Sequence, residues 1–480
     1  MVPRTDFALT RRAFLGRTAG SLGGLALAQL LAEEARAGDT RGADAPRSPR
    51  DPLAPKPPHH PAKAKAVICL FQHGGPSQMD LFDPKPELTK QHGKAHPEKL
   101  EVHFHTQQGK LLASPFKFAK CGQSGVELSE LIPHTAGIID DLTLVRSMTT
   151  DSVDHESALR IIHSGKFFAG RPTWGSWVIY GLGSERRELP AYVVLGDPGG
   201  LPVDGPLNWS SGFLPAVYQG TPFRATGTPV AHLATPADVP VAARTNQLRL
   251  LNELNASHLS RHPGDAELEA RLGHYELAAK MQTAVPEVLD LSKETEETKK
   301  LYGLDDPKCA EYGKRCLLAR RLVERGVRFV QLFLSGQPWD THDKNANRLK
   351  GLCTMTDKPS AALVQDLKRR GLLDSTIVLW TGEFGRLPIS QGADGRDHNR
   401  HAFSLWLAGG GFKKGYVHGS TDPFGYKSVE KVVRVYDLHA TLLDALGLDH
   451  QVLTYPHEGR DDTLTDAAVT DAKVIRDLSA

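Results

Sequence analysis

A polar segment between two apolar runs, within residues 375–411, constrains the fold more than any other stretch of this 480-residue chain. Residues 376–380 (TIVLW) and 403–408 (FSLWLA) are the two apolar runs. Short, continuous, β-branched runs are typical of strands that are buried on both faces, as in parallel sheets covered by helices. The ionisable residues between the runs must therefore be paired, solvated or bound to metal at the edge of a sheet.

Further apolar runs alternate with helical patterns along the chain. Residues 66–71 (AVICLF), 142–145, 191–195 and 327–334 read as buried strands. Alternation of strands and helices predicts an α/β fold: a doubly wound, mostly parallel sheet with helices on both faces. We expect one large domain over residues 66–480, with irregular insertions at about 92–118 and 200–240. We interpret the first insertion as remote from any site and the second as a surface excursion.

The first 37 residues have the features of an export signal. Arg11 and Arg12 belong to a twin-arginine pattern, residues 20–31 are apolar, and residues 35–37 (ARA) resemble a cleavage site. The apolar run is shorter than the ~20 residues that a membrane span requires, which leaves a short amphipathic or anchoring helix as the other interpretation. We therefore expect recognition by the twin-arginine export machinery, a periplasmic or extracellular location, and no transmembrane segment in the mature chain.

Residues 38–65 are expected to form a Pro-rich linker with little to bury. The whole chain has 58 basic and 56 acidic residues, and the signal contains five arginines and three acids, so the mature chain has 53 of each. A neutral balance gives no electrostatic reason to expect nucleic acid as a partner.

Polar residues follow each predicted strand, where ligands bind in open α/β sheets. His73 follows the first strand. The strand at 142–145 leads to a helix with Asp154 or Ser152 as its cap and Gly165 as its end, so that His155 and Ser157 lie in the first turn. The remaining candidates follow the two later strands: Asp340, His342, Glu383, Arg386, Arg396, Asp397 and His398.

Asp340 and His342 are two residues apart, directly after a strand. In extended chain such side chains point the same way, so a carboxylate and an imidazole can reach one point. The alternative is that Asp340 caps a turn and His342 is satisfied within the fold. We expect a divalent metal site drawn from Asp340, His342, Glu383, Asp397 and His398, with His73 and His155 as further candidates. Oxygen and nitrogen ligands without thiolate suit Zn²⁺, with Mn²⁺ or Ca²⁺ also compatible.

Five motifs carry a resemblance to a known family: GGPSQMDLFDPKP (74–86), DHESALRIIHSG (154–165), WDTHDKN (339–345), TGEFGR (381–386) and GRDHN (395–399). Together they make residues 66–449 resemble the exported DUF1501 family and, more distantly, the alkaline phosphatase and sulfatase superfamily. The resemblance implies a doubly wound core with metal at the carboxyl ends of the strands. It does not by itself name a reaction.

Three positions depart from the superfamily pattern. Gln72 and His73 stand where the phosphatases have an aspartate, and Glu383 with Phe384 replaces an Asp-His pair. His155 occupies the place of the nucleophile, with Ser157 nearby, so a formylglycine-type sulfatase is not expected.

A metal ion would favour hydrolysis of a phosphate or sulfate ester, on a small molecule or a polysaccharide. In that hypothesis Arg386 and Arg396 hold the anion, and His155 or Ser157 acts as nucleophile or base. The alternative hypothesis is an inactive or divergent member that serves as an exported binding protein.

Overall fold

The computed structural model describes residues 52–105, 107–186, 188–224, 230, 240–262 and 266–480. The predicted signal peptide and the first half of the predicted linker, residues 38–51, lie outside these residues. Among them, no helix combines the length and apolar character needed to span a bilayer.

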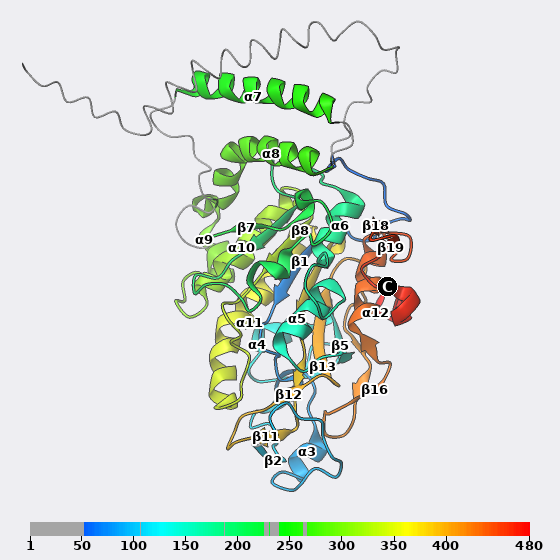
Figure 1. Cartoon of the computed structure of the whole chain (residues 1–480). Coiled ribbons are helices and arrows are strands. Elements are labelled where there is room, and N and C mark those ends of the chain that lie inside the picture. The colour runs from blue at the N-terminus through cyan, green and yellow to red at the C-terminus, as the bar shows by residue number, and fades with distance from the viewer. Residues whose placement is uncertain (1–51, 106, 187, 225–229, 231–239, 263–265) are drawn as a thin grey trace, which may run out of the picture. The chain divides into compact units, whose positions relative to one another are not determined.

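A nine-stranded mixed sheet forms the centre of the domain (Figure 1). All neighbouring strands pair in parallel except β13, which runs antiparallel to both β5 and β9. This confirms the predicted α/β class and the mostly parallel sheet. In spatial order the strands are β14 (Tyr416–His418), β5 (Leu142–Thr149), β13 (Phe403–Ala408), β9 (Thr376–Thr381), β1 (Ala66–Phe71), β8 (Phe329–Leu332), β6 (Tyr192–Leu195) and β7 (Thr221–Phe223), with β17 (Val433–Arg434) also beside β5.

Both faces of the sheet are buried. In β1, Ile68 belongs to one apolar core and its neighbour Val67 to the other, as the alternation of side chains along a strand requires. Helices α10 and α11 contribute to the first core and α5, α6 and α12 to the second, so helices cover both sides (Figure 1). The helices are α2 (Gln78–Leu81), α3 (Pro86–Lys90), α4 (Pro133–Ala136), α5 (His155–Ser164), α6 (Trp174–Leu182), α7 (Val241–Arg261), α8 (Ala266–Leu289), α9 (Glu296–Leu301), α10 (Ala310–Glu324), α11 (Asn345–Arg369), α12 (Val435–Ala445) and α13 (Ala467–Thr470).

Small two-stranded sheets lie outside the main sheet, and two of them shape the edge where the candidate residues lie. The pair β10–β12 aligns Arg386 with His398, and the pair β2–β11 joins the first predicted insertion to the segment after β9. The pairs are β2 (Gln108–Leu111) with β11 (Ile389–Gln391), β10 (Gly385–Arg386) with β12 (His398–Asn399), β3 (Phe118–Cys121) with β4 (Val126–Ser129), β15 (Ser420–Thr421) with β16 (Ser428–Glu430), and β18 (Tyr455–His457) with β19 (Arg460–Asp462).

Two expectations about irregular segments are wrong in part. Residues 200–224 are not a surface excursion: β7 joins the main sheet, and Trp209, Leu214 and Tyr218 are buried in its core. The described end of the predicted linker is also packed, because Lys56 and Lys63 make backbone hydrogen bonds to the domain and Ala64 is buried. Turns and extended segments bury apolar residues without periodicity, so no sequence pattern marks them.

Candidate metal centre

The candidate residues meet because the strands deliver them to one edge of the sheet. The carboxyl ends of β1, β5, β8 and β9 all lie at this edge, since these strands are mutually parallel. Strand β13 is antiparallel, so its beginning lies at the same edge, and residues 396–399 arrive there just before it. His155 comes from the first turn of α5, where Asp154 accepts a hydrogen bond from the Ser157 backbone N–H (3.1 Å) and Gly165 ends the helix at φ 71°. The predicted cap and stop are confirmed.

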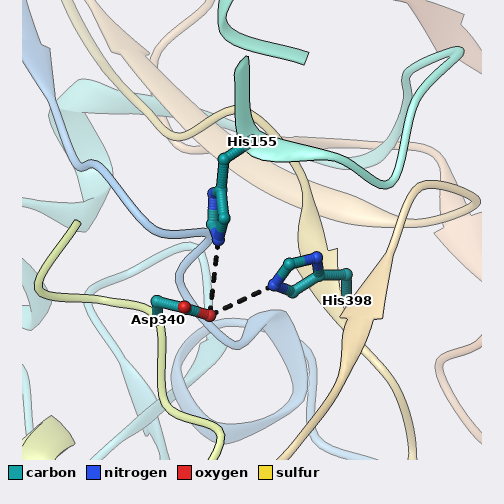
Figure 2. A group of neighbouring side chains, drawn as sticks. All are labelled: His155, Asp340 and His398. Atoms are coloured by element: carbon teal, nitrogen blue, oxygen red, sulfur yellow. Dashed lines mark hydrogen bonds and ion pairs between the residues drawn. The ribbon is translucent and has the colours of Figure 1, made fainter. Parts of the chain in front are cut away.

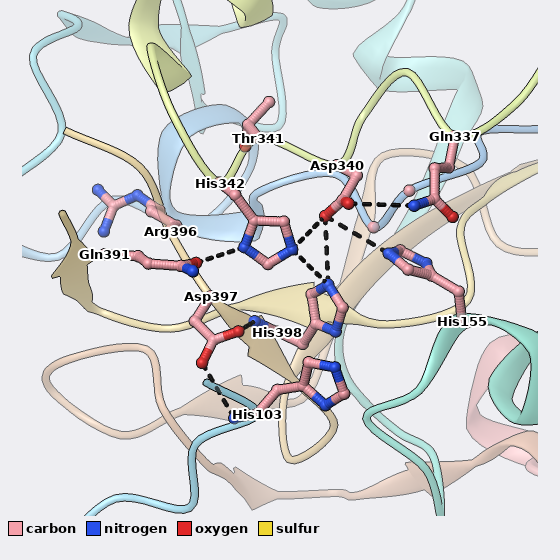
Figure 3. Close-up of polar contacts among 12 residues, drawn as sticks. His103, His155, Gln337, Asp340, Thr341, His342, Gln391, Arg396, Asp397 and His398 are labelled. Atoms are coloured by element: carbon pink, nitrogen blue, oxygen red, sulfur yellow. Dashed lines mark hydrogen bonds and ion pairs between the residues drawn. The ribbon is translucent and has the colours of Figure 1, made fainter. Parts of the chain in front are cut away.

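Three imidazoles converge on one carboxylate oxygen, Asp340 Oδ1 (Figure 3); Figure 2 shows two of them, His155 and His398. Its distances are 3.4 Å to His155 Nε2, 2.9 Å to His342 Nε2 and 3.2 Å to His398 Nε2. His342 Nε2 and His398 Nε2 are 2.9 Å apart. Arg386 donates to the same oxygen at 2.7 Å. We refer to Asp340, His155, His342 and His398 as the Asp340 cluster.

The other nitrogen of each of the three rings is held by an acceptor. His155 Nδ1 lies 2.6 Å from Glu383 Oε1, His398 Nδ1 lies 2.6 Å from the Val153 carbonyl, and His342 Nδ1 contacts Gln391 Oε1. Because these partners accept, Nδ1 of each ring carries a proton for them and Nε2 faces the centre, where it can bind a cation or, when it is itself protonated, donate to Asp340 Oδ1. Metal-binding histidines in proteins are oriented in the same way.

Two carboxylates, Asp340 within the Asp340 cluster and Glu383 behind His155, dominate the electrostatics of the site. Burial alone would lower the pKa of His155, but the hydrogen bonds and charges of Asp340 and Glu383 raise that pKa to about 9. Burial opposes the charge on Asp340, yet hydrogen bonds from the three histidines and the charge of Arg386 hold the pKa of Asp340 below its ordinary value. The carboxylates therefore attract positive charge to this point.

His398 behaves differently from His155. Burial, together with the positive charges of Arg386 and His155, outweighs the hydrogen bond to Asp340 and lowers the pKa of His398 to about 3. His398 is therefore neutral near pH 7, which is the form that binds metals.

Four of the six separations among the donor atoms of the Asp340 cluster match a tetrahedral ion. For Zn²⁺ with ligands at about 2.0–2.1 Å, adjacent ligand atoms lie about 3.3 Å apart, and these four separations run from 2.9 to 3.4 Å. His155, Asp340 and His398 also form a group of possible ligands whose donor atoms all lie within 4.8 Å of one another. His155 Nε2 is buried, and apart from its ion pair with Asp340 at 3.4 Å it has no hydrogen-bond partner among the described residues. Three nitrogens and one oxygen without thiolate suit Zn²⁺ or Mn²⁺. The residues present therefore fit a divalent metal ion.

Asp397 contributes to a second possible grouping, with His342 and His398. Its carboxylate is fixed by backbone N–H groups: Oδ2 accepts from His103 (2.9 Å) and Phe104 (3.0 Å), and Oδ1 from His398 (2.8 Å). With both oxygens engaged, Asp397 orients the loop beside the cluster (Figure 3).

The insertion at residues 92–118 contributes to the site, contrary to our expectation. The His103 ring stacks on His398, with centroids 4.8 Å apart, and the Phe104 ring meets His342 edge-on at 5.1 Å. The backbone N–H groups of His103 and Phe104 donate to the Asp397 side chain and not to a neighbouring strand, so this part of the segment has no regular secondary structure. Only its four histidines marked it in the sequence, and nothing in their spacing linked them to residue 398.

Glu383 and His73 lie outside both groupings of potential metal ligands in the described chain. Glu383 orients His155 and accepts from the Gly74 N–H at 2.8 Å. His73 is buried against Phe71 and Phe333, and neither of its ring nitrogens has a hydrogen-bond partner in the part of the chain that the structure describes. Burial, with the charges of His163 and His155, lowers the pKa of His73 well below its ordinary value, so this imidazole is neutral.

Arg386 and Arg396 are buried, with their guanidinium groups already engaged. Arg386 bonds to the carbonyls of Gly75 (2.9 Å) and Trp339 (3.2 Å) as well as to Asp340. Arg396 forms a buried ion pair with Asp80 at 2.8 Å. Ser157 Oγ bonds to the cap residue Asp154 at 3.1 Å. The structure thus gives all three residues partners within the fold.

Comparisons with solved structures return distant likenesses. The lipoteichoic acid synthase LtaP of Listeria monocytogenes has a TM-score of 0.33 and 9% identity, over 83% of this chain and 76% of that one. The phosphonate monoester hydrolase SpPMH of Silicibacter pomeroyi has a TM-score of 0.34 and 10% identity, over 86% and 76%. The alkaline phosphatase of the Antarctic bacterium TAB5 has a TM-score of 0.27 and 10% identity, over 72% and 92%. TM-scores this low say nothing about chemistry.

No curated protein matches this sequence. A family model described as "Protein of unknown function (DUF1501)" matches residues 64–479, which includes every residue of the Asp340 cluster. The chain therefore belongs to the DUF1501 family.

Proposed function

We propose that the protein is a metal-dependent hydrolase of phosphate or sulfate esters. The observation that carries the proposal is the orientation of the three histidines, each held at Nδ1 by an acceptor so that its Nε2 faces Asp340 Oδ1. Unpaired buried polar groups are costly, and a cation bound between Asp340 Oδ1 and the three Nε2 atoms would pair with all four of them. Asp340, His155, His342 and His398 would hold that cation, with Zn²⁺ as the first expectation.

A divalent ion held by Asp340, His155, His342 and His398 would supply the Lewis acidity that ester hydrolysis needs. The protein's own residues fix the geometry. Glu383 and Gln391 set the orientation of His155 and His342, and Arg386 holds Asp340 by its Oδ1. His155 is a ligand in this proposal rather than the nucleophile. Arg386 and Arg396 position neighbouring groups rather than bind the anion, because their donors are already engaged.

The first experiment measures metal content and turnover together. The full chain is expressed, and the mature protein, from which residues 1–37 have been cleaved on export, is purified from the export compartment. Its metals are determined by elemental analysis. We expect about one divalent ion per chain, lost in Asp340→Asn and in His342→Ala. His401→Ala is the matched control, since His401 lies three residues after His398 but pairs with Glu101 outside the cluster (2.6 Å). Less than about 0.2 metal per chain in the wild type would refute the metal centre.

The second experiment identifies the reaction. Chromogenic phosphate monoesters, phosphate diesters and sulfate esters are supplied to chelated protein and to protein reloaded with Zn²⁺, Mn²⁺ or Ca²⁺. Turnover that requires metal and is lost in Asp340→Asn supports the hydrolase. Stoichiometric metal with no turnover on any ester would favour the exported binding protein.

We also propose export through the twin-arginine machinery, from the pattern at Arg11 and Arg12. Fusion of residues 1–37 to a reporter that folds before export tests this. The reporter should reach the periplasm, and Arg11→Lys with Arg12→Lys should retain it in the cytoplasm. Export of the double variant at the wild-type level would contradict the proposal.

A further inference from the structure

An apolar cavity opens at the same edge of the sheet as the Asp340 cluster. Its volume is about 230 Å³, and it lies at the carboxyl ends of β6, β7 and β8. Trp209, Phe223 and Phe333 line it and are themselves buried, and Leu201 lines it with 63% of its surface exposed. The volume is below the range of drug-sized pockets, which is about 300–1,000 Å³, so it suits a fragment of one or two rings.

One segment joins the cavity to the cluster. It starts at Phe333 in the cavity wall and ends at Asp340, and on the way Gly336 donates its N–H to the Leu201 carbonyl at 3.0 Å. Gln337 then donates to Asp340 Oδ2 at 3.2 Å (Figure 3). Four residues of extended chain span at most about 14 Å, so Gly336, beside the cavity rim, lies within that distance of Asp340. On the side of the cavity that faces the core, the Phe333 ring contacts the His73 ring. The next residue, Gly74, donates its backbone N–H to Glu383.

The cavity offers few polar partners to an occupant. The Asp197 carboxylate lines it, but one of its oxygens accepts from Arg315 (2.7 Å) and the other from the Gly199 N–H (2.7 Å). Arg224 lines it and is exposed. A sugar placed here would leave hydroxyl groups without partners, which costs binding free energy. An apolar ring would leave no polar group unpaired, and the removal of its surface from water would favour binding.

We propose that this cavity receives the alcohol portion of the ester and selects an apolar alcohol that contains one or two rings. The assignment to an ester rests on the hydrolase proposed above. The anionic group of such a substrate reaches the Asp340 cluster while its ring fills the space between Leu201, Trp209 and Phe333. The cavity therefore determines specificity, and its residues take no part in bond breaking.

Gly196 allows the cavity to be filled without strain. It lines the cavity, its φ lies outside the left-handed region, and an added Cβ would meet only the Phe223 carbonyl oxygen, at an ordinary contact distance of 3.5 Å. Gly196→Leu is therefore the blocking variant. Gly351→Leu is the matched control, because Gly351 lies in α11 with nothing within 4 Å of its added Cβ. Leu201→Gln is a second test variant, at an exposed position where folding is not at risk.

The first readout is binding of 2-naphthol, followed by its fluorescence in titrations with the mature protein. We expect saturable binding by the wild type, weakened at least tenfold in Gly196→Leu and several-fold in Leu201→Gln. Gly351→Leu and His342→Ala should bind within twofold of the wild type. Absence of saturable binding, or wild-type binding by both test variants, would overturn the proposal.

The second readout is the ratio of kcat/KM for a 2-naphthyl ester to kcat/KM for the methyl ester of the same acid. We expect this ratio to fall at least tenfold in Gly196→Leu and to stay unchanged in Gly351→Leu. Preference for a glucosyl over a naphthyl ester would overturn the choice of alcohol. Naphthol binding without hydrolysis of any ester would refute the hydrolase and the assignment to an alcohol portion, and would leave an apolar site. Hydrolysis without naphthol binding would refute the site alone.

Discussion

Two carboxylates near the edge of the sheet, the buried Asp80 and the half-buried Asp340, have opposite surroundings. Asp80 accepts from Ser77 (2.6 Å), Asn345 (2.9 Å) and Arg396 (2.8 Å), and its side chain is wholly buried. Asp340 keeps 14% of its side chain exposed, and three imidazoles converge on one of its oxygens. The first carboxylate is saturated by donors of the fold. The second is the meeting point of three imidazole nitrogens whose rings are held from behind by acceptors, which is the arrangement that the proposed metal centre requires.

The largest expected effect separates the two carboxylates by stability. Asp80→Asn leaves the buried Arg396 guanidinium without its counter-ion, and the free energy of unfolding should fall by about 3–5 kcal/mol. In metal-free protein, Asp340→Asn should cost less than half as much, because Asp340 keeps 14% of its side chain exposed to water and Asp80 keeps none, and exposed ion pairs contribute less to stability. Urea denaturation of both variants measures this. Equal losses would mean that the two carboxylates play the same structural role.

The pH dependence of stability tests the same ion pair. Burial raises the pKa of Asp80, but the charge and hydrogen bonds of Arg396, with Ser77 and Asn345, outweigh it and lower the pKa below its ordinary value. A carboxyl with a lower pKa in the folded state stabilises the fold above its unfolded pKa of about 3.9. This stabilisation is lost as the pH falls further. Below about pH 4, the wild type should therefore lose stability more steeply than Asp80→Asn. Parallel pH profiles would contradict this.

Metal should stabilise only the protein with an intact Asp340 cluster. A ligand that binds the folded state at 100 times its Kd adds about 2.7 kcal/mol to the free energy of unfolding. We expect a Zn²⁺-dependent rise in the melting temperature of the wild type and of Asp80→Asn, but none in Asp340→Asn. Thermal denaturation with and without chelator measures it. A similar rise in Asp340→Asn would place the metal elsewhere.

A smaller effect is expected from the residues behind the histidines. Gln391→Ala removes the acceptor of His342 Nδ1 without removing a ligand. Loss of such a partner typically weakens metal binding 10- to 100-fold. Competition with a zinc chelator gives the affinity, and Gln391→Glu, which keeps an acceptor, should restore most of it. An affinity unchanged in Gln391→Ala would remove His342 from the ligand set.

The smallest effect is expected at the insertion. Phe104→Ala removes the ring that contacts His342 but leaves the backbone N–H that binds Asp397. We expect metal content to be unchanged and kcat/KM to fall a few-fold, about 1 kcal/mol or less. Phe167→Ala is the matched control at an exposed phenylalanine outside both groupings of potential ligands. Loss of metal in Phe104→Ala would show that the insertion supports the ligands directly.

The sequence by itself determined the sheet and the edge at which the site lies. Continuous β-branched runs such as residues 66–71 and 376–380 are typical of strands that are buried on both faces of a parallel sheet. Parallel strands then bring the residues after their carboxyl ends to one edge, so Asp340, His342 and His398 could be named as partners. The first and last residues of helix α5 were also predictable from local sequence, because Asp154 is a typical helix N-cap and Gly165 a typical helix end.

Only the tertiary structure decided which of the candidates face one another. Glu383 and His73 come after strands just as Asp340 does, yet Glu383 lies behind His155 and His73 in an apolar environment, because the direction of a side chain beyond a strand end depends on the turn. The contact of His103 with His398 joins residues 295 positions apart through an aperiodic segment. Hydrophobic periodicity encodes the regular elements, whereas such contacts arise from packing between segments distant in the sequence.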